Sequence, residues 1–230
     1  MSAEPHAGRS LTSATDGAAI DSLEADLEEA RRLIAALRRG PDGRSTSIAS
    51  GRGVPGWLAS TLTYCSRCGA RLEFGPLPEE ERERLACPSC GLVTYVNPRL
   101  VVTTLPVTSA GEIVLLRRGI EPAYGMWAQS GGFLEVDETV TEAAIRETVE
   151  ETGLVVEPGA IVGLYSRLEA AVVTLALESR IVGGHPRRTA EALEVAAFAP
   201  EAIPWDEIGL MTSVWALRDW VRSRGVEPPG

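Results

Sequence analysis

The order of hydrophobic and polar positions divides the second half of the chain into short strands and two helices. β-Branched and aliphatic runs predict strands at residues 99–107, 112–117, 160–168, 171–182 and 193–199. Helices are predicted at residues 139–152 and 213–224, and each is followed by a glycine that stops it. This alternation of strands and helices predicts one α/β domain at residues 99–224.

A heptad pattern predicts a further helix at residues 20–40. Its apolar positions are spaced alternately by three and four residues, and they are Ile20, Leu23, Leu27, Ala30, Ile34 and Leu37. Acidic residues dominate its first half and arginines its second, so two copies can pair antiparallel as a homodimer. The alternative is an amphipathic helix packed on its own domain. Composition predicts a disordered tail at residues 1–19 and a linker at residues 41–60.

The cysteines form two Cys-x-x-Cys pairs with 18 residues between them, and they are Cys65, Cys68, Cys87 and Cys90. Four thiolates from two such turns suit the tetrahedral coordination of Zn²⁺, and a site closed by four protein ligands is structural. We therefore predict a zinc ribbon at residues 61–98. The alternatives are two disulfides or a redox-active pair.

The overall charge restricts the partners of this protein. With 22 Lys and Arg against 32 Asp and Glu, the formal net charge is −10, which repels nucleic-acid phosphates and anionic lipids. No apolar run is long enough to span a bilayer, and the N-terminus lacks the pattern of a secretion signal. We therefore expect a cytoplasmic protein that binds no membrane and is unlikely to bind nucleic acid.

The most informative segment is residues 131–154. The pair Gly131-Gly132 leads into the predicted helix, on which Glu147, Glu150 and Glu151 stand at positions i, i+3 and i+4 and share one face. Like charges at this spacing destabilise a helix, and a divalent cation between them reverses that effect. Carboxylate oxygens suit Mg²⁺ or Mn²⁺. The alternative interpretation is an acidic, solvated helix face.

The neighbours of these glutamates are expected to hold the helix in place. Arg146 lies beside the acidic face and can pair with Glu138 or Glu142. The apolar face that packs the helix on the domain is predicted to consist of Val140, Ala144, Ile145 and Val149.

The spacing within this segment resembles the Nudix box, whose positions are filled by Gly132, Glu138, Arg146, Glu147, Glu150, Glu151, Gly153 and Leu154. Thr148 departs from it, since an aliphatic residue is usual there. Gln129-Ser130 also stands where Leu-Pro is usual, and the loss of a proline loosens this loop. From about Tyr64 to about Trp220 the chain is similar to the zinc-ribbon branch of the Nudix hydrolases.

This resemblance implies an α+β fold, a Nudix-type α/β/α sandwich around a mixed sheet, after the small zinc ribbon and the N-terminal helix. It implies a hydrolase that cleaves a nucleoside diphosphate linked to another moiety into two monophosphates. The family members that the chain resembles most act on ADP-ribose, FAD or NADH, so these are the expected substrates. The implied catalytic residues are Arg146 and the metal-binding Glu147, Glu150 and Glu151, one of which, most often at position 147, activates water.

Further residues are candidates for substrate binding. The backbone of Gly131 and Gly132 can approach phosphates closely, and Arg118 or Arg117 can contact them. Candidates to stack on adenine are Tyr124, Tyr165 and Trp127, with buried packing expected for Trp127. Candidates for an additional metal ligand or base are Glu191 and Glu194. Two other functions stay open, namely a catalytically weak nucleotide sensor and, against the acidic charge, a hydrolase of capped RNA.

Overall fold

The computed structural model of the protein describes residues 61–78, 80 and 82–229. The tail, the heptad helix and the linker that the sequence predicts at residues 1–60 lie outside the described residues, so these assignments and the homodimer stay predictions. Within the described ranges, no helix combines the length and the apolar character that crossing a membrane requires.

The segment around the cysteines folds as a small antiparallel sheet. Its three strands follow one another in sequence order, and they are β1 (Glu73–Gly75), β2 (Arg84–Ala86) and β3 (Val93–Thr94). A small cluster of buried side chains, Leu72 and Leu85 with Cys65 and Cys87, forms its core. So few apolar residues bury little surface, and a bound metal is the usual supplement to such a core.

A seven-stranded mixed sheet forms the centre of the rest of the described chain. Its strands are β4 (Arg99–Val107), β5 (Ile113–Arg118), β6 (Trp127–Ala128), β7 (Ser130–Phe133), β8 (Leu154–Arg167), β9 (Val172–Gly184) and β10 (Ala192–Phe198). The main order is β10-β5-β4-β9-β8, while β6 pairs with β5 and β7 pairs with β4. The β4–β9 pair is parallel and the other pairs are antiparallel.

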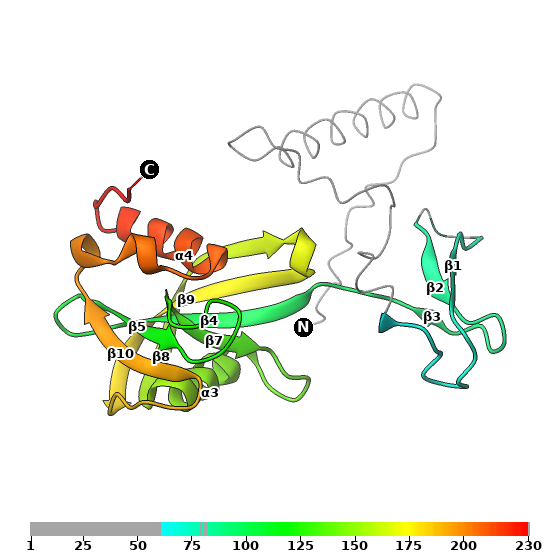
Figure 1. Ribbon diagram of the computed structural model, residues 1–230, viewed down its shortest axis with the longest axis horizontal. Helices are drawn as coiled ribbons and strands as arrows, with labels where there is room; N and C mark the ends of the chain where they lie inside the picture. The colour runs from blue at the N-terminus through cyan, green and yellow to red at the C-terminus, as the bar shows by residue number, and fades with distance from the viewer. Residues whose placement is uncertain (1–60, 79, 81, 230) are drawn as a thin grey trace, which may run out of the picture. The chain divides into compact units, whose positions relative to one another are not determined.

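Two helices cover opposite faces of this sheet, as Figure 1 shows: α3 (Val140–Thr152) and α4 (Met211–Arg222). Three short 3₁₀ helices complete the elements, at Leu168–Ala170, Pro200–Ala202 and Trp205–Glu207. On the α4 side the core includes Leu105, Ile113 and Trp220, and on the α3 side Val102 packs with Ala143. The layers of helix, mixed sheet and helix confirm the predicted α+β sandwich.

One predicted strand is longer than the sequence suggested. Strand β8 begins at Leu154, directly after α3, and not at residue 160. Pro158 and Gly159 indicate a loop in the sequence, yet β8 keeps pairing with β9 through register shifts on both sides of them. A proline is tolerated here because β8 is an edge strand of the sheet.

Helix α3 has strong signals at both ends. Thr139 caps its N-terminus in a reciprocal capping box with Glu142, and Gly153 ends it in the left-handed conformation with φ of 77°. Its buried residues are Ala143, Ala144, Thr148, Glu151 and Thr152. The predicted packing face was therefore wrong in part, because Ile145 and Val149 are only half-buried while hydroxyl-bearing residues face the sheet.

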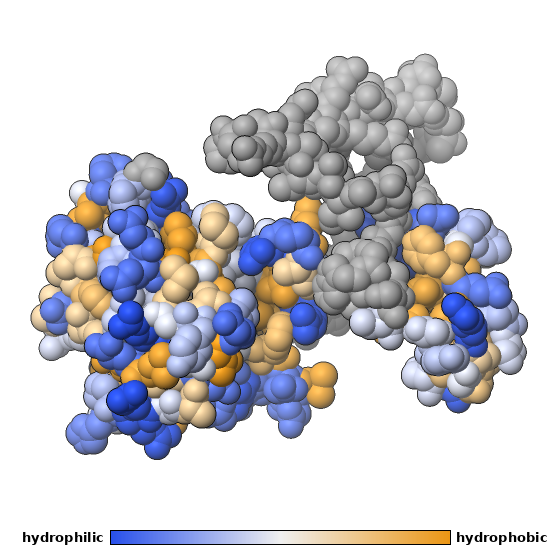
Figure 2. Space-filling model, viewed as in Figure 1, coloured by the Kyte–Doolittle hydropathy of each residue, from blue (hydrophilic) through white to orange (hydrophobic). Residues whose placement is uncertain are grey.

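The surface of the described part is mixed in character. Hydrophilic residues cover most of the face seen in Figure 2, with apolar residues scattered among them. Exposed apolar side chains include Ile161 and Leu164 on the edge strand β8. Single exposed apolar side chains are common in soluble domains and need no functional explanation.

Candidate active site

Strand β7 and helix α3 bring the glycine pair and the acidic residues of the motif together. Gly131 and Gly132 lie on β7, opposite Thr103 and Val102 of β4, and α3 packs against both strands. The glutamates of α3 therefore face a stretch of backbone that carries no side chains. As the sequence suggested, the glycine pair is followed by a loop and then by the acidic helix.

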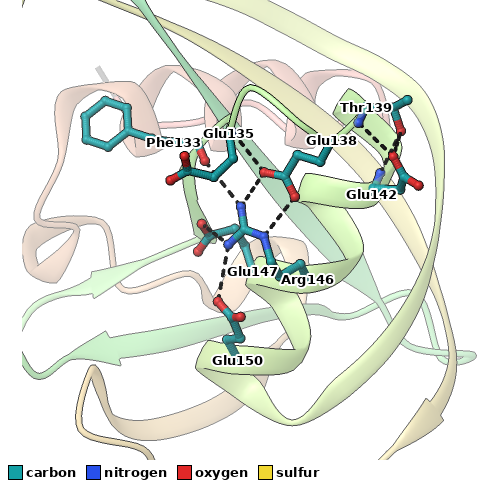
Figure 3. Close-up of polar contacts among 8 residues, drawn as sticks. All are labelled: Phe133, Glu135, Glu138, Thr139, Glu142, Arg146, Glu147 and Glu150. Atoms are coloured by element: carbon teal, nitrogen blue, oxygen red, sulfur yellow. Dashed lines mark hydrogen bonds and ion pairs between the residues drawn. The ribbon is translucent and has the colours of Figure 1, made fainter.

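The guanidinium of Arg146 is the centre of an ion-pair network (Figure 3). It donates to Glu138 through Nε and Nη2, at 2.8 and 2.5 Å. Its Nη1 donates to Glu147 Oε1 at 2.7 Å and to Glu150 Oε2 at 3.2 Å. Of the two partners expected for Arg146, Glu138 is the one found, because Glu142 is engaged in the capping box.

This network changes the charge balance on the acidic face. Hydrogen bonds from Arg146 and from the backbone of Glu135 lower the pKa of Glu138 to about 2. Arg146 also compensates the negative charge of Glu147 and Glu150. The sequence suggested that a divalent cation alone neutralises this face, whereas in the structure Arg146 shares that role. The side chain of Glu150 is 59% exposed and that of Glu147 only 14%.

Glu151 is the most buried acid of the site, with 7% of its surface exposed. Its Oε2 accepts a hydrogen bond from the backbone N–H of Gly131 at 2.8 Å. Burial raises its pKa to about 8 despite this bond, and the charges of Glu147 and Glu191 raise it further while Arg118 opposes them. An uncompensated carboxyl of this kind favours a nearby cation.

The surroundings of Glu147 shift its pKa in the same direction as that of Glu151. Burial raises its pKa, Arg146 opposes this effect, and the charges of Glu150 and Glu191 add to it. A Cβ placed on Gly132 would lie 2.3 Å from Glu147 Oε1. The carboxylate therefore occupies space that any side chain at position 132 would fill, which explains the glycine there.

Gly131 is required for a different reason. Its φ of 148° lies in a region that L-residues rarely adopt, and a Cβ there would lie 2.3 Å from the carbonyl oxygen of Val102. Glycine thus lets β7 approach β4 closely while its N–H reaches Glu151. The two glycines thus let the carboxylates of α3 lie directly against the backbone of β7.

The donor set of the helix fits a hard divalent cation. Glu147, Glu150 and Glu151 offer only carboxylate oxygens, and two of them have pKa values raised by burial. The guanidinium between Glu147 and Glu150 shows that this face accommodates a positive group. The carboxylate oxygens of the three glutamates do not all lie within 4.8 Å of one another. Among the described residues, the sulfur atoms of the four cysteines do.

The four cysteine sulfurs form the second candidate metal site. Cys65 and Cys90 Sγ lie 3.6 Å apart, and Cys68 and Cys87 Sγ lie 3.5 Å apart. These separations exceed a disulfide bond and suit the edges of a tetrahedron around one ion. Burial acts to raise the pKa of Cys65, but backbone hydrogen bonds from Cys68 and Arg67 lower it to about 7, which favours a thiolate.

Comparison with known proteins identifies the families to which the two parts of the described chain are similar. The sequence profile of the NUDIX domain matches residues 97–216, more than half of the chain. The chain belongs to the Nudix hydrolase family. A second profile, that of the Nudix N-terminal zinc ribbon, matches residues 63–96 and includes the four cysteines. Both parts of the predicted resemblance are thereby confirmed.

Relatives of known name cover parts of this Nudix chain. An ADP-ribose pyrophosphatase of Methanocaldococcus jannaschii is 31% identical over 48% of this chain and 67% of its own length. The NAD-capped RNA hydrolase NudC of Pseudomonas aeruginosa is 34% identical over 40% of this chain, a match that spans only 31% of that relative. A NUDIX hydrolase structure from Nitrosomonas europaea has a TM-score of 0.67 at 28% identity, over 72% of this chain and 94% of that one.

The two departures from the usual Nudix pattern lie in contact. Thr148 and Ser130 are both buried, and the Thr104 hydroxyl lies 2.7 Å from that of Thr148 and 2.8 Å from that of Ser130. Thr148 also donates to the carbonyl of Ala144. The hydroxyls in the usual aliphatic and proline positions are thus both hydrogen-bonded to that of Thr104. Gln129 turns to the other side and donates to Thr103 at 3.0 Å.

The other candidates for substrate binding have different surroundings in the fold. Arg118 acts electrostatically on Glu151, and its Nε donates to the carbonyl of Pro122. Tyr165 packs on the α4 side of the sheet, where its hydroxyl donates to Asp219 at 2.8 Å. Its stacking on adenine stays a prediction. Trp127 is buried against Phe198, as the packing interpretation expected, and Tyr124 is exposed.

The loop that carries the candidate Glu191 also reaches the site through Arg187 and Thr189, two residues that the sequence did not single out. The N–H of Arg187 donates to the carbonyl of Thr152, and the hydroxyl of Thr189 donates to that of Glu151. Glu191 on this loop acts on both Glu147 and Glu151. The signal available in the sequence was the Arg187-Arg188 pair between a proline and the predicted strand at 193–199.

Proposed function

We propose that this Nudix protein is a Mg²⁺- or Mn²⁺-dependent pyrophosphohydrolase. Its substrate is a nucleoside diphosphate linked to another moiety, with ADP-ribose, FAD or NADH as the principal candidates, and its products are two monophosphates. The observation that supports this most is the position of Glu151, a buried carboxyl held by the Gly131 N–H beside Glu147.

The residues of the site have separate tasks in this proposal. Glu147, Glu150 and Glu151 would hold the divalent cation, which when bound neutralises the diphosphate and stabilises charge on the transferring phosphoryl group. Arg146 fixes Glu147 through Oε1, while Oε2 has no partner among the described residues. This oxygen supports the alternative role of Glu147, which is to take a proton from the attacking water in place of binding the cation, with Glu191 as a second acid near it.

The glycine pair and the basic residues position the substrate. The missing Cβ of Gly132 leaves room for the Glu147 carboxylate, and that of Gly131 leaves room for β4, so the glycine pair acts on the substrate by letting the carboxylates lie close to β7. Arg118 lies on the Glu151 side of β5 and can offset the charge of a bound diphosphate. Arg146 is engaged by three carboxylates and acts on the substrate through them.

Names of relatives support the class of substrate. The relatives described above are named for ADP-ribose and for NAD-capped RNA, and both substrates contain an adenosine diphosphate linked to another group. A small nucleotide is favoured over RNA for this chain, because its net charge of −10 opposes binding of a polyanion.

A structural zinc ion completes the proposal. The spacing of the four cysteine sulfurs fits Zn²⁺, and the small ribbon core around Leu72 and Leu85 benefits from a central ion. All four ligand positions belong to the protein, so Zn²⁺ has no open site for a substrate. Its expected role is therefore to fold the ribbon.

Hydrolysis of a substrate panel tests the proposed function. We expect release of AMP from ADP-ribose, FAD or NADH with Mg²⁺, and we include NAD-capped RNA as a further substrate. Glu147→Gln and Glu151→Gln should each lower kcat about 100-fold or more, while the exposed Glu201→Gln serves as the matched control. Binding of these nucleotides without any turnover by the natural chain would favour the sensor instead.

A further inference from the structure

A cleft beside the acidic helix is lined by arginines that have no role in the proposed reaction. Its volume is about 610 Å³, and it is lined by Arg117, Gly125, Pro186, Arg187, Arg188, Leu193, Glu194 and Val195. This volume falls within the range of small-molecule sites. Three guanidinium groups line one cleft in a chain whose net charge is −10.

The positive charge of this cleft resides mainly on two residues. Arg117 is already engaged, since its Nε donates to the carbonyl of Gly125 at 2.6 Å and its terminal nitrogens lie 3.8 Å from Glu194 and 3.7 Å from Glu207. Arg187 and Arg188 are exposed, and neither side chain has an ion pair within the described part of the chain. With Glu194 offset by Arg117, two positive charges face the cleft without a counter-charge.

The cleft is tied to the acidic site by one short segment. The Arg187 N–H donates to the carbonyl of Thr152 at 2.9 Å, and the Arg187 side-chain stem packs beside Gly153. Two residues further on, Thr189 donates to the carbonyl of Glu151. Glu191, from the same segment, acts on both Glu147 and Glu151. The same short segment therefore borders both the cleft and the acidic site.

We propose that this cleft is a subsite for a second phosphate of the substrate, a phosphate ester on the nucleoside outside the diphosphate that is cleaved. Guanidinium groups bind phosphate oxygens in pairs of charge-assisted hydrogen bonds, and Arg187 and Arg188 supply two such groups. The inference rests on the proposed function, because it takes the diphosphate to lie at the glutamates. Within the proposed substrate class, it predicts a preference for nucleotides that carry an additional phosphate.

Such a phosphate has two chemical sources, a monoester on a ribose hydroxyl or the diester of a following nucleotide. The first arm of the experiment compares ADP-ribose with ADP-ribose 2′-phosphate. The second compares NAD with NAD extended by one 3′-linked nucleotide. For each pair, kcat/KM is measured with Mg²⁺, and the Kd is measured by calorimetry without added divalent cation, on the full chain.

The natural chain should prefer the phosphorylated member of at least one pair by about tenfold in kcat/KM and in Kd, because a charge-assisted contact is gained. The double variant Arg187→Gln/Arg188→Gln should bring that ratio close to one. Arg167→Gln, which removes a half-buried arginine paired with Glu169 away from the cleft, should keep it. If the double variant fails to fold, Arg188→Gln alone should reduce the ratio in the same direction.

The outcomes separate the two proposals. Ratios near one for both pairs in the natural chain, or a preference that survives the double variant, would overturn the subsite. Absence of turnover for these four compounds and for FAD and NADH would refute the proposed reaction, and the calorimetric ratio would still decide whether the cleft binds phosphate.

Discussion

The hydroxyl oxygens of Thr104 and Thr148 lie 2.7 Å apart in a space closed to solvent, and they join strand β4 to helix α3. Ser130 of β7 lies 2.8 Å from the same Thr104 hydroxyl. Three elements that hold the acidic site thus meet at one hydrogen-bonded group. Because buried hydroxyls without partners are costly, the three side chains depend on one another.

This dependence predicts a coupling between two substitutions. Thr104→Val and Thr148→Val keep the side-chain shape, and each should lower the free energy of unfolding by about 1–3 kcal/mol. The double variant should cost less than the sum, by at least about 0.5 kcal/mol, since the shared hydrogen bond is lost only once. Urea unfolding measures all four proteins, and Thr104→Ser, which keeps the hydroxyl, serves as the control. Strict additivity would show that the two hydroxyls do not interact.

The two neighbouring glycines should respond to alanine in different ways. Gly131→Ala places a Cβ against backbone atoms of Val102 and Thr103 at a φ of 148°, so it should destabilise the fold by more than about 2 kcal/mol. Gly132→Ala meets only the carboxylate end of Glu147, which can move. It should leave the melting temperature nearly unchanged and lower kcat by about 10- to 100-fold. Equal effects of both variants on stability would contradict this assignment.

The pKa of Glu151 gives the stability of the metal-free protein a defined pH dependence. The folded value of about 8 lies above the ordinary 4.5, so the folded state retains a proton that the unfolded state releases between these values. The free energy of unfolding should therefore fall as pH rises from 4.5 to 8, by at most about 1.4 kcal/mol per pH unit, and level off above 8.

Urea unfolding from pH 5 to pH 9 without added divalent cation checks this dependence. Glu151→Gln removes the titrating group, so its stability relative to the natural chain should increase with pH over this range. Glu201→Gln should run parallel to the natural chain. Added Mg²⁺ should stabilise the natural chain more at pH 8 than at pH 6, because the ion binds the deprotonated carboxylate. A constant difference between Glu151→Gln and the natural chain would refute the raised pKa.

The cysteine cluster predicts one zinc ion per chain. Cys87→Ser removes one of four ligands and should lower the bound zinc, measured by elemental analysis, to well below one equivalent. Amide exchange in residues 63–96 should increase more than about tenfold, because the ribbon core is small. Ser66→Ala, a substitution between two of the ligands, is the matched control and should retain the metal. Full zinc content in Cys87→Ser would rule out the four-cysteine site.

Much of the fold could be predicted because its signals are local. The apolar run at Arg99–Val107 has the same bounds as β4, and Gly153 ends α3 where the sequence places the stop. Capping residues and aliphatic runs act within a few positions of the chain, so they can be recognised without knowledge of distant contacts. The spacing of the glutamates and of the cysteines is local in the same sense.

The sequence could not show which partners these motifs would meet. The burial of Thr148 next to Thr104, the extension of β8 through Pro158, and the approach of the Arg187 segment to Glu151 all depend on chain segments far apart in sequence. Each is decided by packing and strand pairing, whose energies depend on the assembled fold.

The sequence by itself therefore determined the Nudix family, the acidic helix and the cysteine pairs, because residue type and spacing are sufficient for these. Only the tertiary structure decided that Arg146 compensates Glu147 and Glu150, that Glu151 is buried with a raised pKa, and that Arg187 and Arg188 line a cleft beside the helix. Charge compensation and burial are properties of three-dimensional surroundings, and they arise only when distant segments come together.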